Sequence, residues 1–198
     1  MTQASMSQYD IVGGYLTIID EEMGISFQDQ APMPIQPEKR YHQDGTLAWE
    51  GYYVDGVLHG PSKSYFANGV LSSISWYVHG KKEGRALFYA EDTSLVHRAR
   101  YLHHRLQGVQ EFYYARGVLR AHLSYKAGLF DGVNRLYYPN GQIKREIFLK
   151  DGKRQGTDSF WEESGEIRFV YEYDMGTCVK TSVQDPNELR FSSYTLLQ

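Results

Sequence analysis

Apolar and polar residues alternate along short runs of this chain, and a turn-forming segment separates each run from the next. One such run begins at Val118 and ends at Tyr125. Its first set of alternate positions is apolar: Leu119, Ala121, Leu123 and Tyr125. The other set is more polar: Val118, Arg120, His122 and Ser124. A period of two residues predicts a half-buried β-strand, and no segment shows sustained helical periodicity.

The runs recur with a period of 24 residues. Six rows align without insertion or deletion, and they begin at Gln36, Gly60, Gly84, Gly108, Gly132 and Gly156. Fifteen of the 19 glycines fall in three columns of this alignment, at the start of the row and nine and twenty residues after it. The third row breaks two columns, with Thr93 and His104 in place of glycine. A fixed period of this length predicts a repeat array in which each unit needs its neighbours.

Two aromatic columns and the turn residues predict the shape of each repeat. Tyrosine or tryptophan stands five residues into every row, and tyrosine stands seventeen residues in, except at Leu149. The glycines follow turn formers, as in Asn68-Gly69 and Asp55-Gly56, which supply the positive φ of tight hairpin turns. We therefore expect an all-β protein: an elongated single-layer antiparallel sheet of six consecutive β-hairpins, with N- and C-terminal caps and with tyrosines stacked in ladders.

These residues resemble the MORN repeat, and more closely its bacterial variant. The stretch from Gly132 through Tyr137-Tyr138-Pro139-Asn140-Gly141 to Ile143, Gly152 and Gly156 carries the resemblance well, apart from Leu149. The resemblance covers residues 36 to about 179 and implies the hairpin fold. It also implies scaffolds for protein partners, sometimes dimeric, and in some cases phospholipid binding. Bacterial proteins of this type are often labelled antitoxins of the YwqK kind.

The alignment divides the chain into three parts. Residues 1–35 are expected to hold a disordered start at 1–8, a capping hairpin at 15–28 and a Pro-rich linker from residue 30. Residues 36–179 form the repeats 36–59, 60–83, 84–107, 108–131, 132–155 and 156–179. Residues 180–198 form a C-terminal cap or tail.

Composition narrows the range of functions. The formal net charge of −3 predicts no nucleic-acid partner. Residues 1–36 hold five acidic residues and no lysine or arginine, whereas the repeats are close to neutral. No apolar run is long enough for a transmembrane helix, and no secretory signal peptide is visible. We expect a cytoplasmic protein, or one exported without a cleavable signal; the single cysteine, Cys178, fits a reducing compartment.

No residue pattern predicts a catalytic, metal or cofactor site. Histidines 97, 103, 104 and 122 lack a helix that would bring them together around zinc. Glu50 and Glu146 share a column but lie four rows apart, too far for paired-carboxylate chemistry. Cys178 has no context that would activate a thiol. We therefore expect a protein that is not an enzyme.

The third row carries an unusual basic run. Six basic residues occur within nine positions without an acid: His97, Arg98, Arg100, His103, His104 and Arg105. One hypothesis is a basic patch for phosphate, anionic lipid or an acidic partner. The other is a degenerate middle repeat whose polar face is solvated.

The more polar strand face supplies candidate partner-binding residues, because binding surfaces favour tryptophan, tyrosine and arginine. They occupy the columns fourteen and sixteen residues into the rows: Tyr52, Ile74, Trp76, Arg98, Arg100, His122 and Phe148. Tyr52, Ile74 and Trp76 would form an apolar patch, which either binds a partner or packs against the N-terminal hairpin.

The sequence thus predicts a non-enzymatic scaffold or adaptor that binds another protein through an extended sheet surface. Edge strands offer a further route, by adding a strand of a partner or of a second copy in a homodimer. The alternatives left open are an antitoxin-like inhibitor of a partner protein, a phospholipid or membrane-surface module and a secreted bacterial effector.

Overall fold

A computed structural model describes residues 8–12, 15–20, 25–32 and 37–183, with side chains for residues 37–182. The described chain is all β apart from one 3-10 turn, η1 (Ala115–Gly117). A small antiparallel sheet has the order β1–β2–β3, with β1 (Gln8–Val12), β2 (Tyr15–Asp20) and β3 (Ile25–Pro32). Everything from Glu38 to Val183 belongs to one antiparallel sheet of 15 strands.

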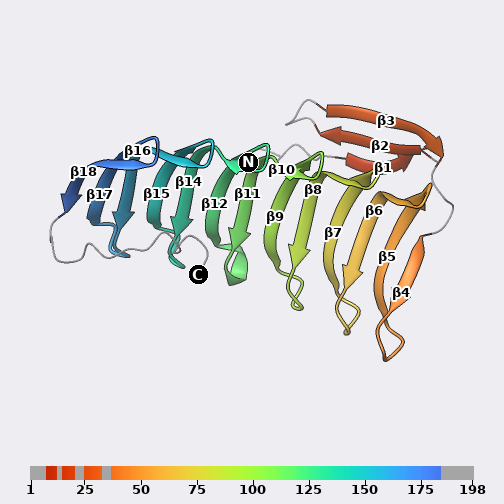
Figure 1. Ribbon diagram of the computed structural model, residues 1–198. Coiled ribbons are helices and arrows are strands. Elements are labelled where there is room, and N and C mark those ends of the chain that lie inside the picture. Colours follow the sequence, from red (N-terminus) through yellow and green to blue (C-terminus); the bar gives the residue numbers. More distant parts are fainter. Residues whose placement is uncertain (1–7, 13–14, 21–24, 33–36, 184–198) are drawn as a thin grey trace.

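The large sheet is an elongated array in which consecutive strands are neighbours (Figure 1). Its strands are β4 (Glu38–Tyr41), β5 (Leu47–Val54), β6 (Val57–Tyr65), β7 (Leu71–Val78), β8 (Lys81–Tyr89), β9 (Leu95–Leu102), β10 (Arg105–Leu106), β11 (Gly108–Tyr113), β12 (Leu119–Lys126), β13 (Leu129–Phe130), β14 (Gly132–Tyr137), β15 (Ile143–Lys150), β16 (Lys153–Trp161), β17 (Ile167–Asp174) and β18 (Thr177–Val183). The predicted hairpin array is confirmed. In the described chain, no helix is long and apolar enough to cross a membrane.

The ends of the chain differ from what we expected. The hairpin at residues 15–28 forms, but it pairs with β1 in the separate small sheet, so β4 receives no strand from it. β3 continues to Pro32, into the segment expected to be a linker. β18 crosses the expected boundary at residue 179, and the expected disordered start before Gln8 and tail after Val183 lie outside the described residues.

Two kinds of turn alternate along the array. At one long edge, turns of the Asp/Asn-Gly type are closed by bonds such as Gly45 N–H to His42 O, 3.0 Å. At the other long edge, two consecutive residues have positive φ, as at Asp55 (51°) and Gly56 (78°), which is the type I′ geometry. The glycine that starts each row also has positive φ and interrupts the strand ladder as a bulge.

Both glycine replacements in the third row keep the glycine conformation. Thr93 and His104 each have a φ of 69°. A left-handed backbone costs a non-glycine residue about 1 kcal/mol or more. The neighbouring repeats therefore hold the third row in the common geometry although its sequence departs from the pattern.

From the second row onward, each type I′ turn is bonded to the preceding repeat by what we call a turn staple. The residue just before each row-starting glycine accepts a hydrogen bond from the first turn residue of the next repeat. The five acceptors are His59, Glu83, Gln107, Asp131 and Gln155, and their donors are the backbone N–H groups of His79, His103, Ala127, Asp151 and Met175. The next turn residue donates its own N–H to a backbone carbonyl of that repeat, as in Gly128 N–H to Leu106 O, 2.8 Å. The staples thus join all five pairs of adjacent rows between residues 37 and 183.

One sheet face, which we call the core face, carries the buried side chains. Its apolar members include Ala86, Ala99, Leu123 and Ile147. Polar side chains are buried beside them, and the bulges explain why. Asn134 accepts the N–H of Ser124 and donates to the carbonyl of Gly132, two groups that lie at the bulge of the fifth row. Buried polar groups need hydrogen-bond partners, and an amide side chain such as that of Asn134 can both donate and accept. The strand bulge therefore favours an amide side chain at residue 134.

A buried ion pair lies farther along the same face. Arg145 donates two hydrogen bonds of 2.7 Å to the carboxylate of Asp158, and their side chains are only 8% and 1% exposed. The Arg145 guanidinium also lies 4.6 Å from the ring centroid of Phe160. Removal of one partner from such a pair leaves an uncompensated buried charge. The core face is therefore held together by buried hydrogen bonds and ion pairs as well as by apolar contacts.

Tyrosines of the seventeenth column line the core face, but they alternate with the residues of the strands between them. Lys82 Nζ lies 5.9 Å from the ring centroid of Tyr77 and 5.1 Å from that of Tyr101. Tyrosines of adjacent rows are two strands apart, or roughly 10 Å, which is too far for direct stacking. The ladder we expected is thus a mixed column of tyrosines and intervening side chains.

A mixed aromatic stack crosses three strands of the core face. The ring centroid of His97 lies 5.0 Å from that of Phe88 and 4.0 Å from that of Phe112, with interplanar angles of 16° and 8°. Burial, assisted by the positive charge of Arg120, lowers the pKa of His97 from 6.5 to about 4. At neutral pH, His97 therefore acts as an uncharged aromatic ring.

Gln107→Ala tests the turn staples. The substitution removes the acceptor of the Ala127 N–H, so we expect a loss of about 1 kcal/mol of stability and amide exchange about fivefold faster at Ala127. NMR-detected hydrogen exchange measures this. Gln43→Ala, at an exposed turn of the opposite edge, is the control and should leave Ala127 unchanged. Equal Ala127 exchange rates in both variants would contradict the role of the staple.

The His97 stack predicts a pH dependence of stability. Since the pKa of His97 is about 4 in the folded chain and 6.5 without these contacts, the unfolded chain binds more protons between these values. The free energy of unfolding should therefore fall as pH drops through this window. His97→Phe keeps the stack and removes the titration, so urea unfolding should give a shallower dependence on pH. The same slope for the variant and the wild type would refute this explanation.

Candidate functional site

The sheet face opposite the core face carries a continuous row of paired charges, and we call it the ion-pair face. Cross-strand register places the members of the row side by side, from β4 to β17: Lys39, Glu50, Lys63, Ile74, Leu87, Arg98, Glu111, His122, Arg135, Glu146, Ser159 and Val170. The row runs along the array, perpendicular to the strands. Every repeat therefore contributes residues to this row.

Three ion pairs form within this row. The Lys63 ammonium lies 3.3 Å from Glu50, the Arg98 guanidinium 2.8 Å from Glu111 and the Arg135 guanidinium 2.5 Å from Glu146. Each pair is partly exposed, and such pairs contribute only about 0–1 kcal/mol to stability. The row thus contributes little to folding but displays a defined pattern of charge.

Tyrosines of the fifth column fix two of the carboxylates. The Tyr65 hydroxyl donates to Glu50 at 2.8 Å, and the Tyr113 hydroxyl donates to Glu111 at 3.0 Å. Burial alone would raise the pKa of Glu50, but the hydrogen bonds from Tyr65 and Lys63 outweigh it and lower that pKa. Burial and the bond to Glu50 raise the pKa of Tyr65 to about 12. Glu50 is therefore ionised and Tyr65 protonated at neutral pH.

A second row lies beside the charges on the same face. Register pairs Pro61 with Trp76, Arg85 with Arg100, Val109 with Ser124, Val133 with Phe148 and Thr157 with Glu172. This row is more apolar than the first, and Phe148 remains 37% exposed. Together the two rows form a strip of charged and apolar side chains.

All seven predicted partner-binding residues lie on the ion-pair face. Three belong to the charged row: Ile74, Arg98 and His122. Four follow the second row, along β5, β7, β9 and β15: Tyr52, Trp76, Arg100 and Phe148. The residues are strung along the array instead of gathered in one pocket. Ile74 lies opposite Leu87, which gives the charged row an apolar interruption.

The basic run of the third row is dispersed by the fold. His97 lies in the core-face stack, whereas Arg98 lies on the ion-pair face beside Glu111. Arg100 is only 9% exposed. The absence of acids within the run therefore says little about its surroundings, because neighbouring strands supply carboxylates.

The remaining members of the run belong to a turn. Glu83 accepts the His103 N–H at 2.8 Å and lies at the same distance from its ring nitrogen. His104 accepts the N–H of Lys82 through Nδ1 at 3.3 Å. Arg105 is exposed at the same edge of the sheet. A single basic patch made of all six residues is not formed.

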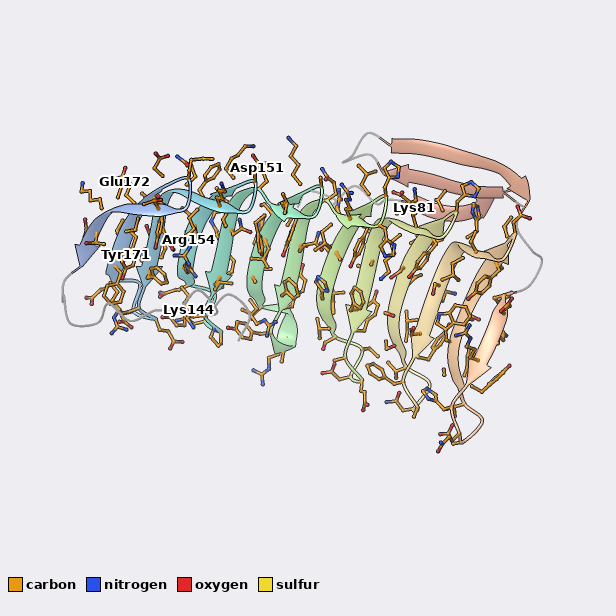
Figure 2. All side chains as sticks on the ribbon, viewed as in Figure 1. Lys81, Lys144, Asp151, Arg154, Tyr171 and Glu172 are labelled. Carbon is orange, nitrogen blue, oxygen red and sulfur yellow. The ribbon has the colours of Figure 1, made fainter. Side chains whose placement is uncertain are left out.

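Figure 2 labels residues toward both long edges of the sheet. Lys81 and Asp151 lie at the type I′ edge, and Lys144 lies toward the opposite edge (Figure 2). Residues at the type I′ edge engage in local pairs, such as Lys150 with Asp131 at 2.9 Å. Both long edges are thus made of solvated turns, and the broad surfaces between them are the two strand faces.

The candidate carboxylates and Cys178 lie in separate parts of the described sheet. Glu50 and Glu146 belong to one row but are separated by eight strand spacings, or roughly 38 Å. Between residues 37 and 182, no three His, Cys, Asp or Glu side chains are grouped closely enough to hold a metal ion. Cys178 is exposed on β18, and its Sγ lies 3.6 Å from the carbonyl of Lys180.

Sequence reasoning missed half of the charged row. The missing half is the column three residues into each row, which includes Lys63, Leu87, Glu111 and Arg135. The sequence did contain the information needed to find this column. In the sheet, a residue at position three of a row lies opposite a residue at position fourteen, as Arg135 lies opposite Glu146. The charges in these two columns are opposite in the first and fifth rows, which is the cross-strand pattern of favourable pairs.

Comparison with known proteins adds family information. Residues 58–78, 106–127 and 130–151 match the family model of the MORN repeat variant. No curated protein matches the chain. The matched segments lie mainly in the second, fourth and fifth rows, and the same hairpin geometry extends over the rest of the array. Three segments of the chain are therefore similar to the MORN repeat variant, and they lie within a continuous array of β-hairpins.

Proposed function

We propose that this protein is a non-enzymatic interaction module that binds another protein through its ion-pair face. MORN repeats are generally thought to mediate protein or membrane interactions. The observation that carries the proposal is the partly exposed strip of charged and apolar side chains on this face. The turns and the tyrosine columns use the recurring residues of the 24-residue pattern, whereas the charged row and the second row carry residues that differ from repeat to repeat.

The second row of the strip varies strongly between repeats. The column sixteen residues into the rows contains Tyr52, Trp76, Arg100, Ser124, Phe148 and Glu172. These residues have no shared structural task, since they differ in size, charge and polarity. Repeat proteins bind partners through surfaces of this kind, in which a constant scaffold holds variable side chains in a line. The fixed strand spacing makes the line rigid, which reduces the entropy lost on binding.

Protein recognition is better supported than lipid binding. A membrane surface attracts clusters of uncompensated basic residues. On the ion-pair face, Lys63, Arg98 and Arg135 each lie beside a carboxylate. Alternating charges with apolar interruptions instead suit a protein surface of matching pattern. Inhibition of a toxin is one form that such binding can take, and it would appear as a stoichiometric complex.

Phe148→Ala tests the proposal in the full chain. Phe148 is 37% exposed on the strip, and Leu129, at a type I′ turn, is 53% exposed and serves as the control site. Affinity capture from native cells should retain a defined protein with the wild type and with Leu129→Ala. Phe148→Ala should bind that protein about tenfold or more weakly, as expected for an aromatic contact in an interface.

Two outcomes would contradict the proposal. One is a wild-type chain that retains no protein above the level of an unrelated control. The other is equal retention by Phe148→Ala and Leu129→Ala, with thermal unfolding showing that both variants are folded. Loss of retention only in the Leu129 variant would move the binding surface to the turn edge.

A further inference from the structure

The charged row has a self-complementary order around His122. Glu111 and then Arg98 follow His122 along the row on one side. Arg135 and then Glu146 follow it on the other side. At each distance from His122, the two residues therefore carry opposite charges. When this part of the row is reversed end to end, a negative charge stands where a positive one stood, and the converse.

This order suits a two-fold axis that runs parallel to the strands and passes beside His122. Half a turn about such an axis brings a second ion-pair face against the first and reverses the direction of the array. Arg98 then lies opposite Glu146 of the second copy, and Glu111 lies opposite its Arg135. Because the operation is two-fold, each of these contacts occurs twice. The symmetry thus opposes unlike charges at all four charged positions beside His122.

Neighbouring registers oppose like charges instead. If the second copy slides by one strand in one direction, Arg98 meets its Arg135. If it slides by one strand in the other direction, Glu111 meets its Glu146. Opposed like charges are strongly unfavourable across an interface. Rotation about the long axis of the array is unfavourable as well, because every charge in the row then faces its own copy. The order of the row therefore favours the axis beside His122.

The same axis matches the apolar positions of the row. Ile74 lies four strands from His122 on one side, and Val170 lies four strands from it on the other. Ile74 therefore lies opposite Val170 of the second copy. A slide of three strands would also oppose unlike charges, but it would place Ile74 opposite Arg135 in one direction and Val170 opposite Glu111 in the other.

The second row adds apolar contacts across the same axis. Ser124 pairs with Val109 on one side, and its Oγ donates to the carbonyl of Val133 on the other at 2.9 Å. Val109 therefore lies opposite Val133 of the second copy, and both are half-buried within one chain. Phe148, which is 37% exposed, faces β9 of the second copy. Removal of this apolar surface from water favours association.

The overlap has the size of a stable interface. About the axis beside His122, the nine strands from β7 to β17 face their counterparts (Figure 1). With ~4.8 Å between strands and about 20 Å of strand length, the shared area is roughly 860 Å² per copy. Standard protein interfaces bury about 800 Å² per partner.

The ion pairs within one chain retain capacity for a second partner. Arg98 uses one terminal nitrogen for Glu111, and Arg135 uses Nε for Glu146. A guanidinium group has five N–H donors, and a carboxylate can accept several hydrogen bonds. These four side chains are between 26% and 39% exposed. Contacts across the axis would therefore join a pair of each copy into a network of four alternating charges.

From these observations we propose that two copies of the chain associate face to face through the ion-pair face, with a two-fold axis beside His122. This inference rests on the proposed function, because it names a second copy as the partner of the same strip. The core faces of the two copies point outward in this dimer.

Sedimentation velocity of the full chain tests the dimer and its register. Arg98→Glu combined with Glu111→Arg reverses one ion pair within the chain and opposes like charges across the axis. We expect this double variant to raise the dissociation constant of the dimer about tenfold or more. Arg135→Glu combined with Glu146→Arg should have the same effect. Thermal unfolding shows whether each variant is folded.

Combination of the two double variants provides a rescue. The quadruple variant again opposes unlike charges and should dimerise like the wild type. An equimolar mixture of the two double variants should form a heterodimer, although each alone associates weakly. Glu50→Lys combined with Lys63→Glu is the matched control, because β5 and β6 lie outside the nine overlapping strands. It should leave the dissociation constant unchanged.

A spin label gives a second readout that leaves the strip unchanged. Glu163→Cys, in a chain with Cys178→Ser, places one label in the exposed turn between β16 and β17. This turn lies three and a half strand spacings from β12, so the labels of two copies should be about 35 Å apart. Pulsed electron paramagnetic resonance measures this distance. An axis between β9 and β11 would give about 50 Å instead.

Several results would overturn the inference. They are a monomeric wild type, a dimer that neither double variant weakens although both are folded, a dimer weakened by the Glu50 and Lys63 control, and a label distance near 50 Å. A monomeric wild type that still retains a different protein through Phe148 refutes the dimer alone. A chain that retains neither a second copy nor another protein refutes the proposed function as well.

Discussion

The architecture depends on left-handed backbone at fixed places in every repeat. Two residues of positive φ close each type I′ turn, and four residues after the second of them another positive-φ glycine bulges the strand, as in Gly80 and Gly84. The bulge interrupts the ladder and leaves backbone N–H and C=O groups that must find partners. Turn N–H groups of the next repeat and the Asn134 side chain supply such partners, as in Gly128 N–H to Leu106 O and Asn134 to the carbonyl of Gly132. The glycines and the polar side chains around them therefore form one structural device, repeated along the sheet.

This device explains how a single layer of strands can be stable. A lone sheet has no second layer to bury its apolar face, so the core face combines small apolar residues, stacked rings and satisfied polar groups. The opposite face contributes less to the stability of the fold. Its ion pairs are exposed enough to contribute little stability, and its composition changes from repeat to repeat. Because the core face supplies most of the stability, residues of the ion-pair face can differ between repeats without loss of the fold.

Periodicity was sufficient to predict the hairpins, the turn glycines and the face on which Leu123 is buried. It was not sufficient for the third row, where Thr93 and His104 stand in place of the turn glycines. Their φ of 69° shows that the neighbouring repeats override the local preference of these residues. The sequence pattern did not predict the staple acceptors. His59, Glu83 and Gln107 are different residue types, and they have in common only a side-chain atom that accepts a hydrogen bond. The charges of the basic run were misleading for a related reason: Glu111 lies next to Arg98 in space but thirteen residues away in sequence.

The most direct measurement of this account is an alanine scan of the fifth repeat, residues 132–155, with stability and partner binding recorded for each variant. The account predicts two separate sets. Substitutions at Asn134, Arg145 and Ile147, on the core face, should lower stability, while those at Arg135, Glu146 and Phe148 should weaken binding with little change in stability. Binding losses confined to the core face or the turns, with the ion-pair face insensitive, would contradict it.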